Sequence, residues 1–201
     1  MSARLVVLVS GTGTNLQALL DASVNPDYGA RVVGVGADRE RTPAIERAKA
    51  AGVETFVLPL SAAVDRSAWD EMLTTKVSGL SPDLVVLAGF MKLAGPAFLA
   101  HFAGRCLNTH PSLLPSFPGM RGPGEALAYG VKVAGATLFV VDAGVDTGPI
   151  VAQAVVPVHD DDTETSLHER IKVVERDMLV DSVGRMVREG FTIKGRKVTI
   201  P

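Results

Sequence analysis

The chain has 201 residues, of which 47% are hydrophobic and 21% charged, with a formal net charge of −2. This composition is typical of a globular protein with a substantial core, and it excludes a disordered chain. Because the net charge is small and the basic residues form no run, the sequence predicts no surface for nucleic acid or membranes.

Short β-branched runs alternate with helical patterns along the chain. Several runs are apolar on successive residues, which indicates strands buried on both faces of a sheet. The alternation predicts an α/β fold, doubly wound around a mostly parallel sheet with Rossmann-like nucleotide-binding topology, in one domain over residues 1–201. The predicted strands are Leu5–Val9, Arg31–Gly36, Thr55–Leu58, Leu84–Ala88, Arg105–Asn108, Ala136–Val141 and Ile150–Val156. The predicted helices are Asn15–Ala22, Pro43–Ala51, Ser67–Ser78, Pro96–Phe102, Gly124–Tyr129 and Thr163–Arg188.

A glycine-rich turn, Ser10-Gly-Thr-Gly-Thr-Asn15, joins the first strand to the first helix. The free N–H groups and partial positive charge of a helix start favour phosphate there. The dinucleotide fingerprint fails because Leu16 stands where it needs a third glycine, and the Walker lysine is missing. The turn therefore favours a monophosphate, although a tight strand-to-helix turn without a ligand would give the same pattern.

Cys106 is the only cysteine, and it lies in an apolar stretch. We interpret it as a buried structural thiol, and a single cysteine excludes an internal disulfide framework. No apolar stretch is long enough for a transmembrane helix, and no secretory signal is visible. The cytoplasm is the expected compartment.

His110 differs from the other three histidines because it lies just past the end of a predicted strand. In open parallel sheets the ligand crevice lies outside these strand ends. Asn108 and His110 are two residues apart, so in an extended stretch their side chains point the same way and can hold one oxygen that gains negative charge. Ser112 is a weaker alternative nucleophile, since it lacks the strand-turn-helix elbow of hydrolases.

A second glycine-rich segment, Val141 to Pro149, contains Asp142 and Asp146, and either could pair with His110. A carboxylate favours the imidazolium form and fixes the orientation of the ring. Spacing alone favours the alternative, a turn in which the aspartates bond their own backbone. No pair of histidines has the helical spacing of metal ligands, so the sequence predicts no metal site.

The last predicted helix carries one apolar stripe, formed by Leu167, Ile171, Val174 and Met178. After it, two short β-branched runs around Lys194-Gly195 predict a small hairpin.

Read together, these segments resemble the folate-dependent formyltransferase family, along almost the whole chain from Leu5 to about Val187. The resemblance is most specific in Ser10–Asn15, Leu87–Lys92, Asn108–Pro115 and Asp142–Pro149. The glycine turn favours members that act on glycinamide ribonucleotide. The resemblance implies transfer of a formyl group from 10-formyltetrahydrofolate, as co-substrate and without a metal, to the amine of that ribonucleotide in purine synthesis.

The resemblance also implies residue roles. Asn108 and His110 would hold and protonate the formyl oxygen, and Asp146 would keep His110 cationic. The ribonucleotide would meet Gly13, Thr14, Asn15 and, at its ribose, Glu175. The folate would meet Arg66, Met91, Lys92, Leu93, Ala94, Asn108, Asp142, Ala143, Gly144, Val145 and Asp146. Residues 1–104 would then form the ribonucleotide-binding half, and residues 105–201, with the long last helix, the catalytic and folate-binding half.

Four positions depart from the family pattern. Arg121, Phe139 and Arg176 replace histidines that are common in relatives, and Lys92 replaces a usual arginine. None is a member of the proposed centre, but Arg121 belongs to a loop that is a candidate lid. Relatives often form homodimers, which the sequence neither supports nor excludes.

Three alternatives compete with formyl transfer to the ribonucleotide. A formyltetrahydrofolate hydrolase shares the catalytic elements but usually has an additional amino-terminal domain, whereas this chain starts with the first strand. A transfer RNA formyltransferase needs a further domain and a basic surface. A non-catalytic nucleotide-binding module explains the glycine turn but gives no purpose to Asn108, His110 and Asp146.

Overall fold

The computed structural model describes residues 2–201, which form two compact units, residues 2–108 and Thr109–Pro201. The first unit has an entirely parallel sheet in the order β3-β2-β1-β4-β5. Its strands are β1 (Ala3–Val9), β2 (Ala30–Ala37), β3 (Glu54–Val57), β4 (Leu84–Leu87) and β5 (Cys106–His110), the last of which runs into the second unit.

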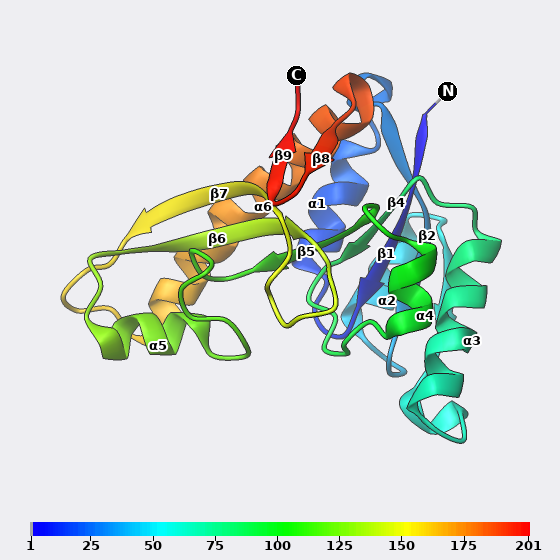
Figure 1. Cartoon of the computed structure of the whole chain (residues 1–201), viewed down its shortest axis with the longest axis horizontal. Coiled ribbons are helices and arrows are strands. Elements are labelled where there is room, and N and C mark those ends of the chain that lie inside the picture. Colours follow the sequence, from blue (N-terminus) through cyan, green and yellow to red (C-terminus); the bar gives the residue numbers. More distant parts are fainter. Residues whose placement is uncertain (1) are drawn as a thin grey trace. The chain divides into compact units, whose positions relative to one another are not determined.

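The central strand β1 pairs with β2 on one side and with β4 on the other (Figure 1). Every residue from Leu5 to Val9 is essentially inaccessible to solvent, as the continuous apolar run predicted. The helices of this unit are α1 (Thr14–Ala22), α2 (Pro43–Ala50), α3 (Arg66–Gly79) and α4 (Pro96–His101), with 3-10 turns η1 (Pro26–Tyr28) and η2 (Leu60–Ala62).

The chain winds outward from β1 through β2 to β3, and then returns to β4 on the other side of β1. Right-handed crossovers therefore place α1 and α2 on one face of the sheet and α3 and α4 on the other, and the packing of α1 on α2 and of α3 on α4 agrees. The predicted doubly wound α/β fold is confirmed. Its topological switch lies between β1 and β4, so a ligand crevice belongs at the carboxyl ends of these strands.

The second unit is built differently. Its elements are α5 (Gly122–Tyr129), β6 (Val133–Val140), β7 (Ile150–Pro157), α6 (Glu164–Glu189), β8 (Thr192–Lys194) and β9 (Lys197–Thr199). Strands β6 and β7 are antiparallel, as are β8 and β9, while β7 and β9 are parallel. The loop between β6 and β7 contains no helix, and without a crossover two successive strands pair antiparallel. The predicted final hairpin is present as β8 and β9.

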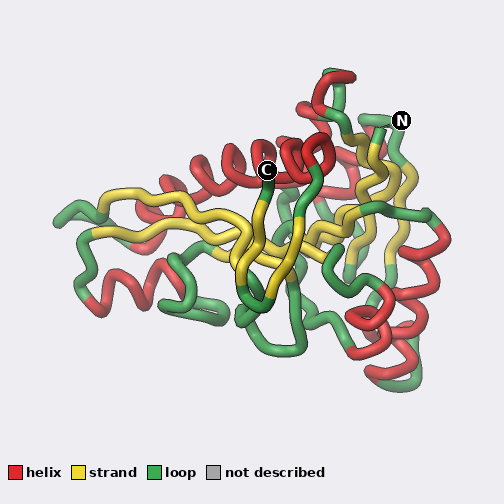
Figure 2. The backbone as a smooth tube through the Cα atoms, turned by 45° about the horizontal axis from the view of Figure 1, so that its top comes forward, coloured by secondary structure: helices red, strands yellow, loops and turns green. Residues whose placement is uncertain are grey.

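Helix α6 packs along β6 and β7 (Figure 2). It begins with a capping box, in which Thr163 and Ser166 satisfy each other's backbone N–H groups. Leu167, Ile171 and Met178 of the predicted stripe are buried. No helix within residues 2–201 is long and apolar enough to cross a membrane.

Candidate active site

His110 is the last residue of β5, and only 5% of its surface is exposed. One ring nitrogen, Nδ1, lies 3.5 Å from Oδ2 of Asp146. The other, Nε2, lies 2.8 Å from the carbonyl oxygen of Phe117, to which it can donate a hydrogen bond. Both ring nitrogens therefore face oxygen atoms, one of a carboxylate and one of a backbone carbonyl.

Asp146 lies in the loop between β6 and β7 in the left-handed backbone region, with φ 54°. Aspartate tolerates this conformation better than most residues. Its Oδ2 also accepts a hydrogen bond from the backbone N–H of Gly119 at 2.8 Å. The carboxylate therefore contacts both the histidine and the loop that follows it.

Asp142 has a different environment in the same loop. Its Oδ1 accepts hydrogen bonds from the N–H of Gly144 at 3.1 Å and from the hydroxyl of Thr147 at 2.6 Å. Asp142 therefore forms the local turn, bonded to its own backbone, that the sequence allowed for either aspartate. The structure thus separates the two: Asp142 stabilises its own loop, and Asp146 faces His110.

The segment after β5 is held by polar contacts that the sequence did not reveal. The fully buried hydroxyl of Thr137, on β6, donates to the carbonyl of Ser112 at 2.7 Å and accepts from the N–H of Leu114 at 3.0 Å. The Ser112 hydroxyl donates to the carbonyl of Ser116 at 2.6 Å. Because the buried Ser112 hydroxyl is used within the loop, it does not fit the role of a nucleophile.

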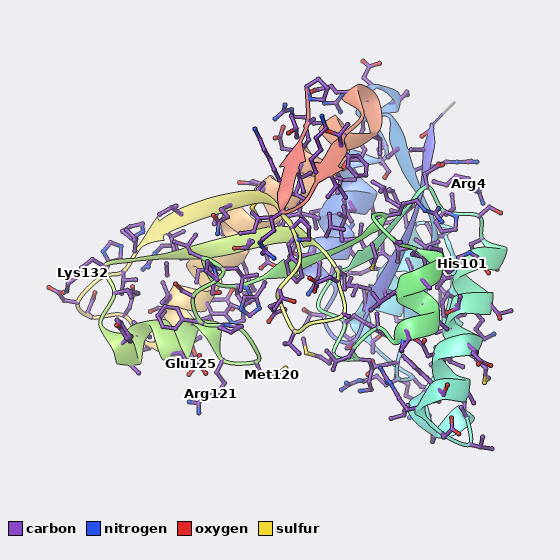
Figure 3. The ribbon with its side chains drawn as sticks, viewed as in Figure 1. Arg4, His101, Met120, Arg121, Glu125 and Lys132 are labelled. Atoms are coloured by element: carbon purple, nitrogen blue, oxygen red, sulfur yellow. The ribbon has the colours of Figure 1, made fainter. Side chains whose placement is uncertain are left out.

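Two backbone features shape the loop next to His110. Phe117 lies in the left-handed region with φ 54°, which directs its carbonyl to the imidazole. Gly122 packs so closely that a Cβ there would lie 3.4 Å from Nε2 of His110 and 3.0 Å from the carbonyl oxygen of Pro111. Arg121, by contrast, is exposed and points away from the ribbon (Figure 3). Its side chain therefore lies outside the buried centre.

In the first unit, the glycine turn follows β1 and opens α1. Gly13 is the N-cap residue and has φ 73°, and no side chain among residues 2–201 caps this helix start. A helix start of this kind carries partial positive charge that favours an anion. A Cβ at Gly13 would lie 2.6 Å from the Cβ of Ala44, so glycine is required. Thr14 and Asn15 form the first turn of α1.

The residues assigned to the folate side of this unit lie together. Arg66, the first residue of α3, donates to the carbonyl of Leu93 and stacks on the ring of Trp69 at 4.4 Å. Met91 and Leu93 are 51% and 65% exposed, so apolar surface is available there for a ligand. Glu175, assigned to the ribose, belongs to the second unit, where it lies on the buried side of α6.

Asp38, just after β2, is a site residue that the sequence interpretation missed. Its side chain is 1% exposed and its Oδ2 lies 2.9 Å from Nζ of Lys92. Burial alone would raise its pKa, but hydrogen bonds from Arg39, Lys92 and Ser10 outweigh burial and lower the pKa to about 2. An acidic residue directly after a buried strand was the signal that could have found it.

Known proteins resemble this chain along most of its length. The model of the formyl transferase family matches residues 3–183. A phosphoribosylglycinamide formyltransferase from Mycobacterium tuberculosis is 57% identical over 198 residues, covering 98% of this chain and 91% of that protein. One from Escherichia coli is 41% identical, covering 85% and 81%. The solved glycinamide ribonucleotide transformylase 1 from Symbiobacterium toebii superposes with a TM-score of 0.96 at 42% identity, covering 99% and 94%.

Proposed function

The chain belongs to the formyl transferase family, and we infer that it transfers the formyl group of 10-formyltetrahydrofolate to the amine of phosphoribosylglycinamide, a step of de novo purine biosynthesis. The observation that carries this inference is the pair formed by the buried His110, at the end of β5, and Asp146 of the loop between β6 and β7. The pair suits formyl transfer because attack on the formyl carbon places negative charge on its oxygen.

We assign the work on that oxygen to Nδ1 of His110. Nε2 is engaged by the carbonyl of Phe117, which fixes the plane of the ring. The 3.5 Å between Nδ1 and Oδ2 of Asp146 exceeds an ordinary hydrogen bond, so the Nδ1–H is not fully engaged by the carboxylate and could donate to a formyl oxygen placed beside it. Asn108, two residues earlier in β5, would supply a second donor from its carboxamide.

The reaction also moves a proton from the attacking amine to the nitrogen that leaves. Asp146 can accept the proton of the attacking amine while His110 donates its hydrogen bond to the oxyanion. A water held between Asp146 and His110 would carry the proton between the two nitrogens. Asp146 therefore has two roles in this proposal: it stabilises the imidazolium, and it takes part in the proton relay.

The remaining assigned residues would bind the two substrates. The phosphate of the ribonucleotide would sit on the start of α1 at Gly13, Thr14 and Asn15, and its ribose would meet Glu175. The flat edge of the folate would be read by the main chain of residues 91–94 and 142–146, with Arg66 close to its tail. The protein would act in the cytoplasm on these small molecules, alone or as a homodimer.

The decisive experiment supplies 10-formyltetrahydrofolate with and without phosphoribosylglycinamide and measures both products. We expect deformylation only when the ribonucleotide is present. Equal deformylation in its absence would identify a hydrolase, and no turnover with tight ribonucleotide binding would identify a binding module.

The variant His110→Ala should lose about two to three powers of ten in kcat. His159→Ala, which removes an exposed imidazole, is the matched control. Equal activity of the two variants would remove His110 from the mechanism.

A further inference from the structure

The carboxylate of Asp38 joins segments that follow three neighbouring strands of the first unit. Asp38 follows β2, Ser10 follows β1, and Lys92 lies in the segment after β4. Lys92 contacts Oδ2 of Asp38 at 2.9 Å, and Arg39 donates to both carboxylate oxygens at 3.2 and 3.1 Å. The Ser10 hydroxyl also donates to the carboxylate. The two oxygens of Asp38 are thus surrounded by donors.

Ser10 extends this connection to the backbone of the segment after β4. Its hydroxyl oxygen accepts a hydrogen bond from the N–H of Met91 at 2.8 Å, and its own N–H donates to the carbonyl of Gly89 at 3.2 Å. Asp38 therefore reaches Met91 through one hydroxyl and Lys92 directly. The glycine turn begins at Ser10, so the same carboxylate also fixes the start of that turn.

Direct contact of Asp38 with a ligand does not fit this geometry. In dinucleotide-binding folds an acidic residue after the second strand accepts hydrogen bonds from a ribose. Here the side chain is 1% exposed, and both oxygens already accept hydrogen bonds from protein groups. Its buried charge is instead compensated by donors of the protein itself. This is expected of a carboxylate that fixes the positions of neighbouring side chains and backbone.

We propose that Asp38 is a positioning residue that joins the glycine turn to residues 91–94, so that the ribonucleotide and folate sites form together. The proposal rests on the proposed function, which assigns the ribonucleotide phosphate to the turn and the folate to residues 91–94. Removing the negative charge leaves Lys92 without its partner and frees both segments at once.

The test begins with Asp38→Asn, which keeps the shape of the side chain but removes its charge. We expect KM to rise at least about fivefold for both substrates, with a smaller change in kcat, because the chemistry depends on His110 and Asp146. A rise in KM for only one substrate, or for neither, would overturn the proposal. A loss of thermal stability with both KM values unchanged would show a purely structural role.

Three further variants test the individual contacts of Asp38 and provide a control. Ser10→Ala breaks the link to Met91 without burying an uncompensated charge, and should raise KM for the folate. If Asp38 acts through Lys92, the double variant Asp38→Asn/Lys92→Met should be no weaker in folate binding than either single variant. Glu40→Gln, which removes the charge of an exposed carboxylate two residues away, is the matched control and should leave both KM values near their original level.

Amide hydrogen exchange provides a readout that does not depend on turnover. In Asp38→Asn, the amides of residues 10–15 and 91–94 should both exchange faster, and those of β6 should be unchanged. If the unaltered protein showed no transferase activity, the proposed function would fail, and exchange would still decide whether Asp38 joins the segments. Unchanged exchange in either segment would overturn the proposal.

Discussion

Asp146→Asn isolates the charge at position 146 from its shape. Asparagine accepts the left-handed backbone at φ 54° about as readily as aspartate, so the change should add little strain. The amide oxygen of the new side chain can still accept the hydrogen bond from Gly119 that Asp146 accepts at 2.8 Å. Because the same oxygen, Oδ2, faces both Gly119 and Nδ1 of His110, an amide oxygen in its place keeps both contacts but carries no negative charge to favour the imidazolium.

The magnitude of the effect on turnover follows from the loss of this negative charge. The proposed mechanism loses both the imidazolium donor to the formyl oxygen and the carboxylate of the proton relay. Loss of one such donor costs about two to three powers of ten in rate, or about 3 to 4 kcal/mol of transition-state stabilisation. Global stability should change by less than about 2 kcal/mol, because His110 can become neutral and leave no uncompensated buried charge. The loss should therefore appear in kcat in a folded protein.

The assay is steady-state turnover with both substrates varied, together with thermal unfolding of the same samples. Asp142→Asn is the informative comparison, because Asp142 bonds within its own loop rather than to His110. That variant should raise KM for the folate and leave kcat within about tenfold. A kcat for Asp146→Asn within about threefold of the unaltered protein would refute the assigned role of Asp146.

Three further outcomes can be checked independently. Gly13→Ala should lower stability by at least about 1 kcal/mol and weaken ribonucleotide binding, because φ is 73° and the new Cβ would meet Ala44 at 2.6 Å; equilibrium unfolding and titration with the ribonucleotide measure both. Burial raises the pKa of the Cys106 thiol to about 12, so a thiol reagent should label the protein only as fast as it unfolds, and rapid labelling of the native protein would contradict this burial. Because the pKa of Asp38 is lowered to about 2, its contribution of about 2 kcal/mol is complete above about pH 4 and lost as the pH falls toward 2. Asp38→Asn should therefore show a shallower loss of stability over that range in denaturant titrations, and parallel curves would exclude the contribution.

The parallel half of the fold could be predicted because its signal is local. Continuous apolar runs such as Leu5–Val9 identify buried strands, and the alternation with helical patterns identifies the winding. Pairing direction in the second unit was not predicted. The direction depends on whether the segment between β6 and β7 connects them directly or crosses over the sheet, and the glycine-rich sequence of that segment does not distinguish the two.

The candidate active site was also predicted only in part from the sequence. His110 could be chosen from its place after a strand, but periodicity could not separate Asp142 from Asp146, since both lie in one irregular loop. The backbone conformation at Asp146 makes the difference, and it brings the carboxylate to His110. Asp38 and Thr137 were missed because their partners are distant in sequence, and single-chain patterns reveal neighbours along the chain rather than across a sheet.

The left-handed backbone of Phe117 has a consequence for evolution and engineering. Phenylalanine is disfavoured in this region by about 1 to 2 kcal/mol, whereas glycine is not. Phe117→Gly would relieve this strain, but it would also remove the edge contact between the rings of Phe117 and Tyr129, whose centroids lie 5.8 Å apart. It would also let the carbonyl that orients His110 move away from the ring. One change at this residue would therefore act on stability and on catalysis by separate routes, and slower turnover in a folded Phe117→Gly protein would show that the strained backbone serves the orientation of His110.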